Sequence, residues 1–248
     1  MKRIIAITNH KGGVGKTTSV SSLGVALSDM GRRVLLVDLD PQGNLSDSLS
    51  VPTSGRTLYD AIQERGDLPQ VQVRERLWVC PSSIDLVSTD LELSGVKRRE
   101  YVLRDLLSPL DYDYILLDCP PSLGLLTINA LSASGEVFVP LTPEALPAKG
   151  LSTLLAIIQR TRETLNPDLH LGGIIITRYN RRKINRIVEE TLRESFGELV
   201  FKTRIRENVD ISESPLKGTD IFTYSPRSIG AEDYRSLALE VDSKTGNK

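Results

Sequence analysis

The chain has 248 residues and a mass of 27.4 kDa, and its 40% hydrophobic and 25% charged residues exclude wholesale disorder. The net charge is −1, so any anionic partner has to be bound by a local patch. The two cysteines, Cys80 and Cys119, exclude a disulfide framework and a four-cysteine metal site. No apolar run is long enough for a secretory signal or a membrane span, and we therefore expect a cytoplasmic location.

Short runs rich in Ile, Val and Leu alternate along the chain with longer segments of helical periodicity. In chain order, strands are expected at Arg3–Thr8, Val34–Asp38, Leu77–Cys80, Tyr114–Asp118, Val137–Leu141, Gly173–Thr177 and Leu199–Lys202. Helices are expected at Lys16–Met30, Thr57–Arg65, Val96–Leu107, Leu123–Ala133, Gly150–Leu165, Ile184–Phe196 and Ala231–Val241. Several of the strands are apolar at consecutive positions, which is typical of strands buried on both faces of a parallel sheet.

This alternation predicts a single α/β domain over residues 1–248, built as an open, mostly parallel twisted sheet with helices on both faces. Residues 243–248 are expected to form a flexible tail. In sheets of this kind, ligands bind beyond the carboxyl ends of the strands. The polar residues that follow the strands are therefore the candidates for a functional site.

A glycine-rich loop follows the first strand and precedes the first helix. It consists of Lys11, Gly12, Gly13, Val14, Gly15, Lys16, Thr17 and Thr18. Glycines let the backbone curl so that several N–H groups face one anion, and the helix N-terminus adds its dipole. Lys16 would supply a charge to the β- and γ-phosphates of a nucleotide, and the Thr17 hydroxyl would ligate Mg²⁺. The strict phosphate-loop pattern needs glycine where His10 stands, and a glycine-rich turn without a ligand is the alternative.

The same residues resemble the deviant Walker A motif of the ParA/MinD ATPases, whose mark is an extra lysine, here Lys11. The resemblance implies a P-loop NTPase fold, ATP and Mg²⁺ as ligands, and hydrolysis of ATP to ADP and phosphate. It also implies that Lys11 acts with Lys16 in catalysis, by reaching across an ATP-sandwiched dimer to the phosphates bound by the partner subunit. From the residues alone, Lys11 is equally well explained as a solvated loop lysine.

Two aspartates lie at the end of the second strand, Asp38 and, two residues further on, Asp40, so they share a face of an extended segment. Residues 38–44 closely match the Asp-x-Asp-Pro-Gln-Gly-Asn segment of the same family. The match implies that Asp40 positions or polarises the attacking water and that Asp38 supports the Mg²⁺ shell or the loop. Without the family match, both aspartates are explained as caps of a helix or turn before Pro41.

The apolar strand at Tyr114–Asp118 ends in a carboxylate, an arrangement that is typical of a group that holds Mg²⁺ through water. Residues 118–131 closely match the chromosomal ParA (Soj) branch of the family, and the resemblance extends over nearly the whole chain. It implies that Asp118 contributes to the metal site. It also implies that Asn180, Asn208 and Pro215 lie near the adenine base.

Basic residues concentrate between Arg178 and Arg206, where nine Lys or Arg and four Glu give a local balance of +5. Asp38–Gln70, by contrast, has six acids and two bases. Clustered Lys and Arg suffice to bind a phosphate backbone without any element that reads bases. A solvated helix face is the alternative interpretation of the same charges.

Soj-type relatives bind DNA nonspecifically as ATP-bound dimers, and the resemblance implies this role for Arg182. Arg204 and Arg206 are further candidates for contact with DNA because they belong to the same basic segment. The chain departs from the family where Glu207 and Asp210 stand in place of two arginines. Arg204 and Arg206 compensate if the basic patch is displaced toward them; otherwise, contact with DNA is weaker or absent.

These features favour an ATPase that partitions DNA. We expect a homodimer when ATP is bound, nonspecific DNA of the nucleoid and a ParB-like protein as partners, and no contact with a membrane. A related ATPase that positions another cargo, such as a microcompartment or a chemoreceptor array, fits the sequence as well. A MinD-like membrane switch is less favoured because the C-terminal segment Ala231–Asp242 is acidic and short of large apolar residues. A metabolic relative is less favoured because no substrate-specific motif is present.

Overall fold

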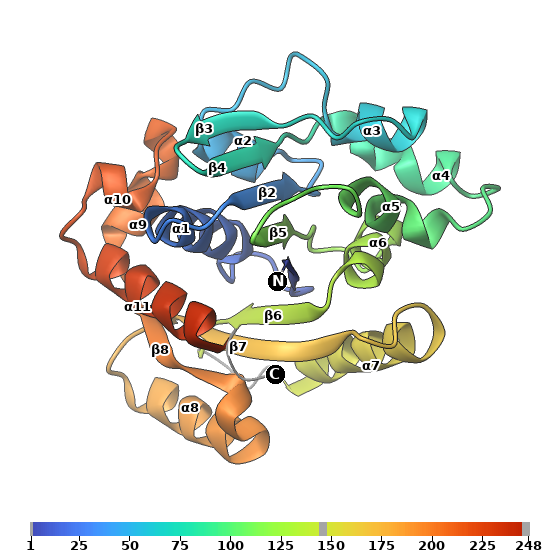
Figure 1. Cartoon of the computed structure of the whole chain (residues 1–248). Helices are drawn as coiled ribbons and strands as arrows, with labels where there is room; N and C mark the ends of the chain where they lie inside the picture. The colour runs from blue at the N-terminus through green and yellow to red at the C-terminus, as the bar shows by residue number, and fades with distance from the viewer. Residues whose placement is uncertain (1, 144–147, 245–248) are drawn as a thin grey trace.

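The computed structural model describes residues 2–143 and 148–244, and a twisted sheet forms its centre (Figure 1). Within these residues the sheet has eight strands in the order β3-β4-β2-β5-β1-β6-β7-β8. The strands are β1 (Arg3–Ile7), β2 (Val34–Asp38), β3 (Val71–Arg74), β4 (Leu77–Cys80), β5 (Tyr114–Asp118), β6 (Glu136–Leu141), β7 (His170–Tyr179) and β8 (Val200–Arg206). All neighbouring strands are parallel except β3 and β4, so the predicted open, mostly parallel sheet is confirmed.

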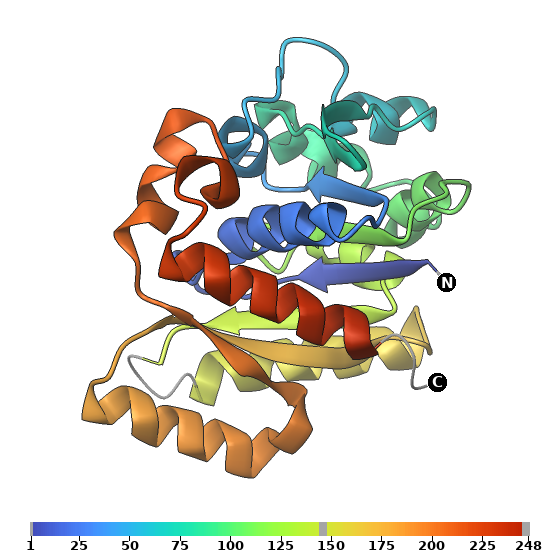
Figure 2. The ribbon, with the colours of Figure 1, turned by 60° about the vertical axis from the view of Figure 1, so that its left-hand side comes forward.

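Helices cover both faces of the sheet. The α-helices are α1 (Lys16–Asp29), α2 (Asn44–Ser48), α3 (Leu58–Glu64), α4 (Thr89–Glu92), α5 (Val102–Leu107), α6 (Leu125–Ala133), α7 (Ala148–Thr164), α8 (Lys183–Phe196), α9 (Val209–Glu213), α10 (Ile221–Tyr224) and α11 (Ile229–Ser243). Short 3-10 turns are η1 (Ile84–Ser88), η2 (Arg99–Tyr101), η3 (Gly197–Leu199) and η4 (Pro215–Lys217). Figure 2 shows α1 and α11 side by side on one face, while α5, α6 and α7 cover the other. Of the predicted tail, residues 245–248 lie outside the described residues.

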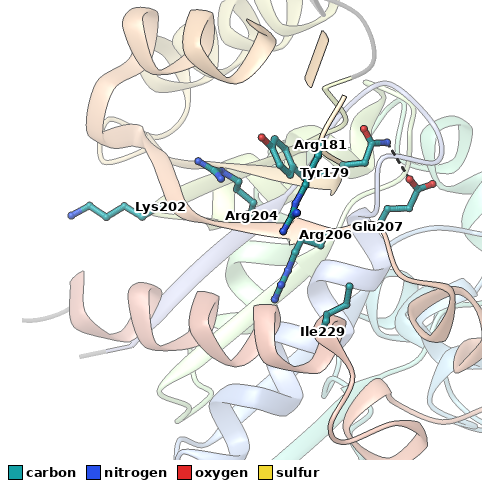
Figure 3. A pocket seen from close by; sticks show the side chains of 8 residues that line it. Tyr179, Arg181, Lys202, Arg204, Arg206, Glu207 and Ile229 are labelled. Atoms are coloured by element: carbon teal, nitrogen blue, oxygen red, sulfur yellow. Dashed lines mark hydrogen bonds between the residues drawn. The ribbon is translucent and has the colours of Figure 1, made fainter. Parts of the chain in front are cut away.

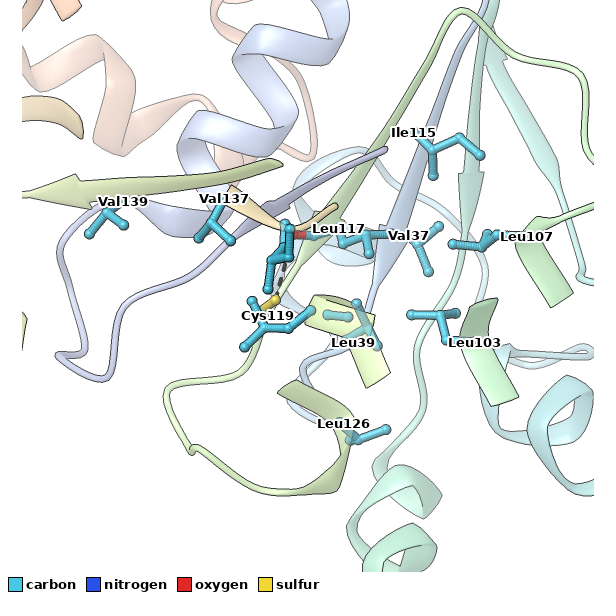
Figure 4. Close-up of a cluster of buried hydrophobic side chains, with 14 of the residues drawn as sticks. Val37, Leu39, Leu103, Leu107, Ile115, Leu117, Cys119, Leu126, Val137 and Val139 are labelled. Atoms are coloured by element: carbon cyan, nitrogen blue, oxygen red, sulfur yellow. Dashed lines mark hydrogen bonds between the residues drawn. The ribbon is translucent and has the colours of Figure 1, made fainter. Parts of the chain in front are cut away.

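Two apolar clusters fill the space between the sheet and its two helical layers. The side chains of β1 alternate between them, since Ile5 and Ile7 belong to the cluster under α1 and α11 and Ala6 belongs to the other. Figure 4 shows the second cluster, in which Cys119 is fully buried with its Sγ 3.9 Å from the carbonyl oxygen of Leu117. Burial raises the pKa of the Cys119 thiol, so this group packs as a small apolar side chain.

The structure differs from the sequence-based elements at the edges of the sheet. β8 is longer than the predicted apolar run because it continues into exposed polar residues as far as Arg206. β7 is longer at both ends, with half-buried residues at 170–172 and the exposed Arg178 and half-buried Tyr179 after the apolar run. The edge strand β3, which the sequence did not predict, is only half-buried and pairs with β4 alone. The helix expected at Val96–Leu107 begins later because Arg98 has a φ of +60°, which a right-handed helix cannot contain.

The centre of the sheet brings three strand ends together. β1 lies between β5 and β6, where the strand order changes direction, and ligands of open α/β sheets bind at such a point. In the strand register, Ile7 of β1 and Asp38 of β2 both lie level with Asp118 of β5. The glycine-rich loop after β1 and the two aspartates therefore meet at the same carboxyl edge.

Candidate functional site

The loop after β1 curls back on itself before it enters α1. Gly13 and Gly15 have φ values of +72° and +85°, a left-handed conformation that glycine adopts without the steric cost of a side chain. The backbone N–H of Ser19 donates to the carbonyl of Gly15 at 2.9 Å, and the regular helix continues from this bond. The N–H groups of the first turn have no helical partner and, together with the helix dipole, create a site suited to an anion.

Two side chains that the sequence reasoning missed hold this loop in place. The Asn9 amide donates to the carbonyl of Pro140 at 2.8 Å and accepts from the N–H of Lys11 at 3.1 Å. At the end of β7, the Thr177 hydroxyl donates to the carbonyl of Val14 at 2.8 Å. Asn9 is visible in the sequence only as a polar residue after a strand, and Thr177 is 163 residues from Val14, so no local pattern could have revealed it.

The two lysines of the loop have opposite surroundings. Lys16 is buried, with 8% of its surface exposed, and its Nζ lies 3.4 Å from the carbonyl of Lys11. Burial lowers the pKa of Lys16, and the carboxylates of Asp118 and Asp40 oppose that shift. The Lys11 side chain is exposed and forms no hydrogen bond or ion pair within the described part of the chain. Lys16 is thus directed to the loop itself, while Lys11 is available to another molecule.

Asp118, at the end of β5, is fully buried, and neither of its carboxylate oxygens has a hydrogen-bond partner among the described residues. Burial raises the pKa of Asp118 well above its usual value, the neighbouring Asp38 adds to the rise, and the positive charge of Lys16 opposes it. Buried polar atoms are rarely left without a partner in folded proteins. This carboxylate is therefore complementary to a cation, or to the water molecules around one, at the edge of the sheet.

Asp38 uses its carboxylate to organise the loop that follows its own strand. Its Oδ1 accepts from the N–H of Asp40 at 3.2 Å, and its Oδ2 accepts from the N–H and the hydroxyl of Ser46 at 2.9 and 2.8 Å. Burial raises the pKa of Asp38 to about 6, although these hydrogen bonds act in the opposite direction. Both oxygens are engaged within the loop, which favours a positioning role, and the metal role of Asp38 stays a prediction.

Asp40 is held by its backbone at the rim of a cleft. Its carbonyl accepts from the Ser82 hydroxyl at 2.6 Å, and its Oδ1 accepts from the N–H of Gln42 at 3.0 Å. The Ser82 N–H donates in turn to the hydroxyl of Ser46 at 3.2 Å, which ties this loop to the end of β4. Asp40 lines the cleft, and its role in orienting a water molecule there stays a prediction.

The cleft has a volume of about 940 Å³ and is large enough for a nucleotide. The glycine-rich loop and Asp40 line one part of it, and the segment that contains α9 and η4 lines another, including Asn208 and Pro215. Asn180, the third residue expected near the base, lies instead in the lining of a neighbouring cavity. Its Nδ2 donates to Glu207 at 3.1 Å, and its Oδ1 accepts from Asn185 at 2.5 Å.

The donor set of the cleft fits Mg²⁺ bound together with phosphates. Thr17 lines the cleft, and the unpartnered carboxylate of Asp118 lies close to it. Mg²⁺ takes oxygen ligands and keeps several waters, so it needs few protein groups when phosphates supply the rest. Accordingly, residues 2–143 and 148–244 contain no group of three or more His, Cys, Asp or Glu arranged to hold a metal by itself.

A second cavity, of about 670 Å³, lies at the ends of β7 and β8 (Figure 3). Its lining consists of Tyr179, Asn180, Arg181, Lys202, Arg204, Arg206, Glu207 and Ile229. Arg206 and Glu207 line this cavity and the cleft as well, so they form the wall between the two. The second cavity is therefore basic and directly adjoins the phosphate loop cleft.

Two of the three arginines expected to bind DNA are paired with carboxylates. The Nε of Arg204 lies 2.7 Å from the buried carboxylate of Glu189. Arg206 lies 2.6 Å from Asp233 of α11, and its ion pairs raise the pKa of the guanidinium. The charge balance over residues 178–206 overstated the free positive charge, because the acidic residues of α11 lie outside that segment.

Four exposed cations without an acidic partner lie at the turn into α8 and on β8. Arg181, Arg182, Lys183 and Lys202 are exposed, and none of them forms an ion pair within the two described stretches. We call these residues the basic patch. Arg181 and Lys202 also line the second cavity, and Arg182 is the sequence candidate that belongs to the patch.

The C-terminal helix α11 packs one face against the core. Of the α11 side chains, Ala231, Tyr234, Leu237, Ala238 and Val241 are buried. Among the helices that the structure describes, none has both the length and the apolar character needed to cross a membrane.

A phosphate-binding loop at the centre of a parallel sheet, a buried lysine at the head of its helix and two carboxylates at the adjoining strand ends define a P-loop nucleotide-binding protein.

The comparisons with known proteins identify the family within that class. A family model described as an AAA domain matches residues 2–171. The chromosome partitioning protein ParA of Caulobacter vibrioides is 41% identical over 98% of this chain and 94% of its own length. The sporulation initiation inhibitor protein Soj of Bacillus subtilis is 43% identical over 97% of this chain and 98% of its own.

One solved structure is similar to this chain in fold as well as in sequence. Cobyrinic acid a,c-diamide synthase from Mycobacterium smegmatis, with a bound ATP analogue and magnesium, has a TM-score of 0.89 at 34% identity. The match covers 100% of this chain and 96% of that one. The chain therefore belongs to the AAA-domain family and, within it, to the ParA/Soj-type partitioning ATPases.

Proposed function

We propose that the protein is a Mg²⁺- and ATP-dependent dimerising switch that binds DNA nonspecifically and drives chromosome or plasmid segregation with a ParB-like partner. One observation carries the proposal. The phosphate loop cleft, with the exposed Lys11 ahead of it, adjoins a basic cavity across the shared wall of Arg206 and Glu207. The site for the nucleotide and the site for an anionic partner therefore lie next to each other.

Within the cleft, each group has a distinct role. The N–H groups of the curled loop and the buried ammonium of Lys16 bind the phosphates, and Thr18 extends this cradle into α1. Thr17 and, through water, Asp118 would hold Mg²⁺, which neutralises charge on the phosphates when bound. Asp40 orients the attacking water, and Asp38 positions Asp40 through its hydrogen bond of 3.2 Å.

Lys11 links hydrolysis to dimerisation. Its ammonium is exposed and has no partner within the described part of its own chain. When two clefts face each other, each Lys11 contacts the phosphates bound by the other subunit and supplies positive charge in trans, as an arginine finger does. The dimer is then stable only while the triphosphate is present.

The basic patch is the surface we assign to DNA. Its four cations are exposed and unpaired within the described residues, whereas Arg206 is paired with Glu232 and Asp233, and Arg204 shares the carboxylate of Glu189 with Arg193. Exposed Lys and Arg bind phosphates through release of counterions and need no contact with bases. Glu207, just before α9, and Asp210, in the first turn of α9, disfavour DNA there, so the contact is displaced to the turn into α8.

The cellular cycle follows from these parts. The ATP-bound dimer coats the nucleoid, and a ParB-like protein bound at a centromere site triggers hydrolysis and release. Most apolar side chains of α11 are buried in the core and only Ile229 and Leu239 are exposed, which supports a nucleoid location over attachment to a membrane.

Retention of DNA as a function of salt, with ATP and Mg²⁺ present, tests the proposal. We expect the logarithm of the DNA association constant to fall linearly with the logarithm of the salt concentration. The Arg182→Glu variant should bind DNA more weakly with unchanged ATP affinity. Lys97→Glu, at an exposed position between α4 and α5, is the charge-matched control and should bind like the wild type. DNA retention that is absent or insensitive to salt would remove DNA from the proposal and favour another cargo.

A further inference from the structure

Arg178 is a cation of the phosphate loop cleft that none of the roles above uses. It lines the cleft directly after Thr177, whose hydroxyl anchors Val14 of the loop at 2.8 Å. Arg178 is exposed, and its side chain forms no hydrogen bond, ion pair or ring contact with the described residues. A long cationic side chain therefore stands at the cleft without any group that explains its position.

The other basic residues that line the cleft are already engaged. These are Lys16, whose Nζ lies 3.4 Å from the Lys11 carbonyl, and Arg206, which is paired with Asp233 at 2.6 Å. Acidic residues also line the cleft, but none of them forms an ion pair with Arg178; they are Asp40, Asp47, Glu207 and Asp220. Besides Lys16, which we assign to the phosphates, Arg178 is thus a cleft cation that has no acidic partner among the described residues.

The backbone at Arg178 has an unusual conformation. Its φ is +50°, in the left-handed region that side chains other than glycine, asparagine and aspartate rarely adopt. The register of β7 against β8 is irregular here, because Ile176 pairs with Arg204 and Tyr179 pairs with Arg206. Three steps on β7 therefore match two on β8, which places a β-bulge at Thr177 and Arg178. Bulges beside active sites redirect a side chain, and backbone strain concentrates at such positions.

We propose that Arg178 is a nucleotide-binding residue whose guanidinium contacts the phosphate chain from the β7 side of the cleft. The neighbouring Thr177 methyl lies 3.7 Å from the point that a Cβ on Gly15 would occupy, so Arg178 follows a residue packed against the phosphate loop. A guanidinium offers paired N–H donors that match phosphate oxygens. The proposal rests on the nucleotide site proposed above but not on dimerisation, DNA or a partner protein.

Calorimetric titration with ATP and with inorganic tripolyphosphate tests this assignment. We expect Arg178→Met to weaken the binding of both ligands about tenfold or more, as loss of a charge-assisted contact does. Arg65→Met, at an exposed arginine with a φ of +54° that follows α3 and lines neither cavity, is the matched control and should bind both ligands like the wild type. Arg178→Gly separates binding from folding, because glycine accepts the left-handed conformation. We expect the free energy of unfolding of Arg178→Gly to be no lower than that of the wild type. Its affinity for both ligands should fall as far as that of Arg178→Met.

The outcomes distinguish the two proposals. A wild-type protein that binds neither ligand would refute the nucleotide site itself. A wild type that binds ATP, together with Arg178 variants of equal affinity, would refute only the role of Arg178. Weakened binding of ATP with unchanged binding of tripolyphosphate would place the contact on the nucleoside and overturn the phosphate assignment.

Discussion

Replacing Asp118 by asparagine should stabilise the nucleotide-free protein while removing its response to Mg²⁺-ATP. Asp118 is fully buried, and neither carboxylate oxygen has a hydrogen-bond partner among the described residues. Asparagine keeps the shape of the side chain but carries no charge. The gain is limited because the new amide also lacks a partner. We expect a rise of about 1–3 kcal/mol in the free energy of unfolding at pH 7.5.

The raised pKa values determine whether stability rises or falls with pH. The pKa values of Asp118 and Asp38 are both raised in the folded protein, so between pH 4 and their folded values the native state holds more protons than the unfolded chain. Stability therefore falls as pH rises through this range. For Asp38, the rise from 3.8 to about 6, at about 1.4 kcal/mol per pH unit, corresponds to about 3 kcal/mol. The Asp118→Asn variant lacks the part of this pH-dependent loss that comes from Asp118. The difference in free energy of unfolding between the variant and the wild type therefore grows with pH.

Urea denaturation from pH 4.5 to pH 8, without nucleotide, measures this difference. At pH 7.5, a gain of 2 kcal/mol corresponds to a melting temperature higher by about 4–8 °C. Asp111→Asn is the control, since that side chain is 94% exposed and its loss should change stability by less than about 0.5 kcal/mol. A variant less stable than the wild type at pH 7.5, or a difference that does not change with pH, would refute the reasoning.

Two further substitutions examine the phosphate loop. Lys16→Ala removes a buried ammonium that would contact phosphates, so calorimetry should show ATP affinity reduced by at least about 10–100-fold with no loss of folding stability. Persistent tight binding would contradict the role of Lys16. Gly15→Ala places a side chain at a φ of +85° without a steric clash, so urea denaturation should show a loss of about 1–2 kcal/mol. Gly12→Ala, where φ is not left-handed and the space is open, should be close to neutral, and equal losses for both variants would rule out this explanation.

The sheet was predictable where its strands are buried on both faces. β2 and β5 are buried at every position, so their apolar runs are unmistakable in the sequence. β3 was missed because it is a half-buried edge strand, and β8 was cut short because its last residues are exposed arginines such as Arg206. The strand order depends on pairings such as that of β1 with β5, more than 100 residues apart, which no local pattern encodes.

The residues of the site also fall into two groups, those that the sequence predicts and those that only the structure shows. Asp38 and Asp118 each end a strand, and the glycine-rich loop and Asp40 each follow one; the structure brings them to one carboxyl edge. Thr177 and Asp233 act on residues that are distant in the chain, so their contacts with the loop and with Arg206 became visible only in three dimensions. These long-range contacts anchor the phosphate loop and show which cations are free.

Sedimentation of the Asp40→Ala variant with ATP and Mg²⁺, with and without DNA, tests the central claim most directly. Loss of the water-orienting carboxylate should leave nucleotide binding intact and block hydrolysis. We predict a stable dimer of about 55 kDa, twice the chain mass of 27.4 kDa, that sediments with added DNA and dissociates when Lys11 is also replaced by alanine. A protein that remains monomeric with ATP bound, or that hydrolyses ATP at the wild-type rate, would contradict the switch.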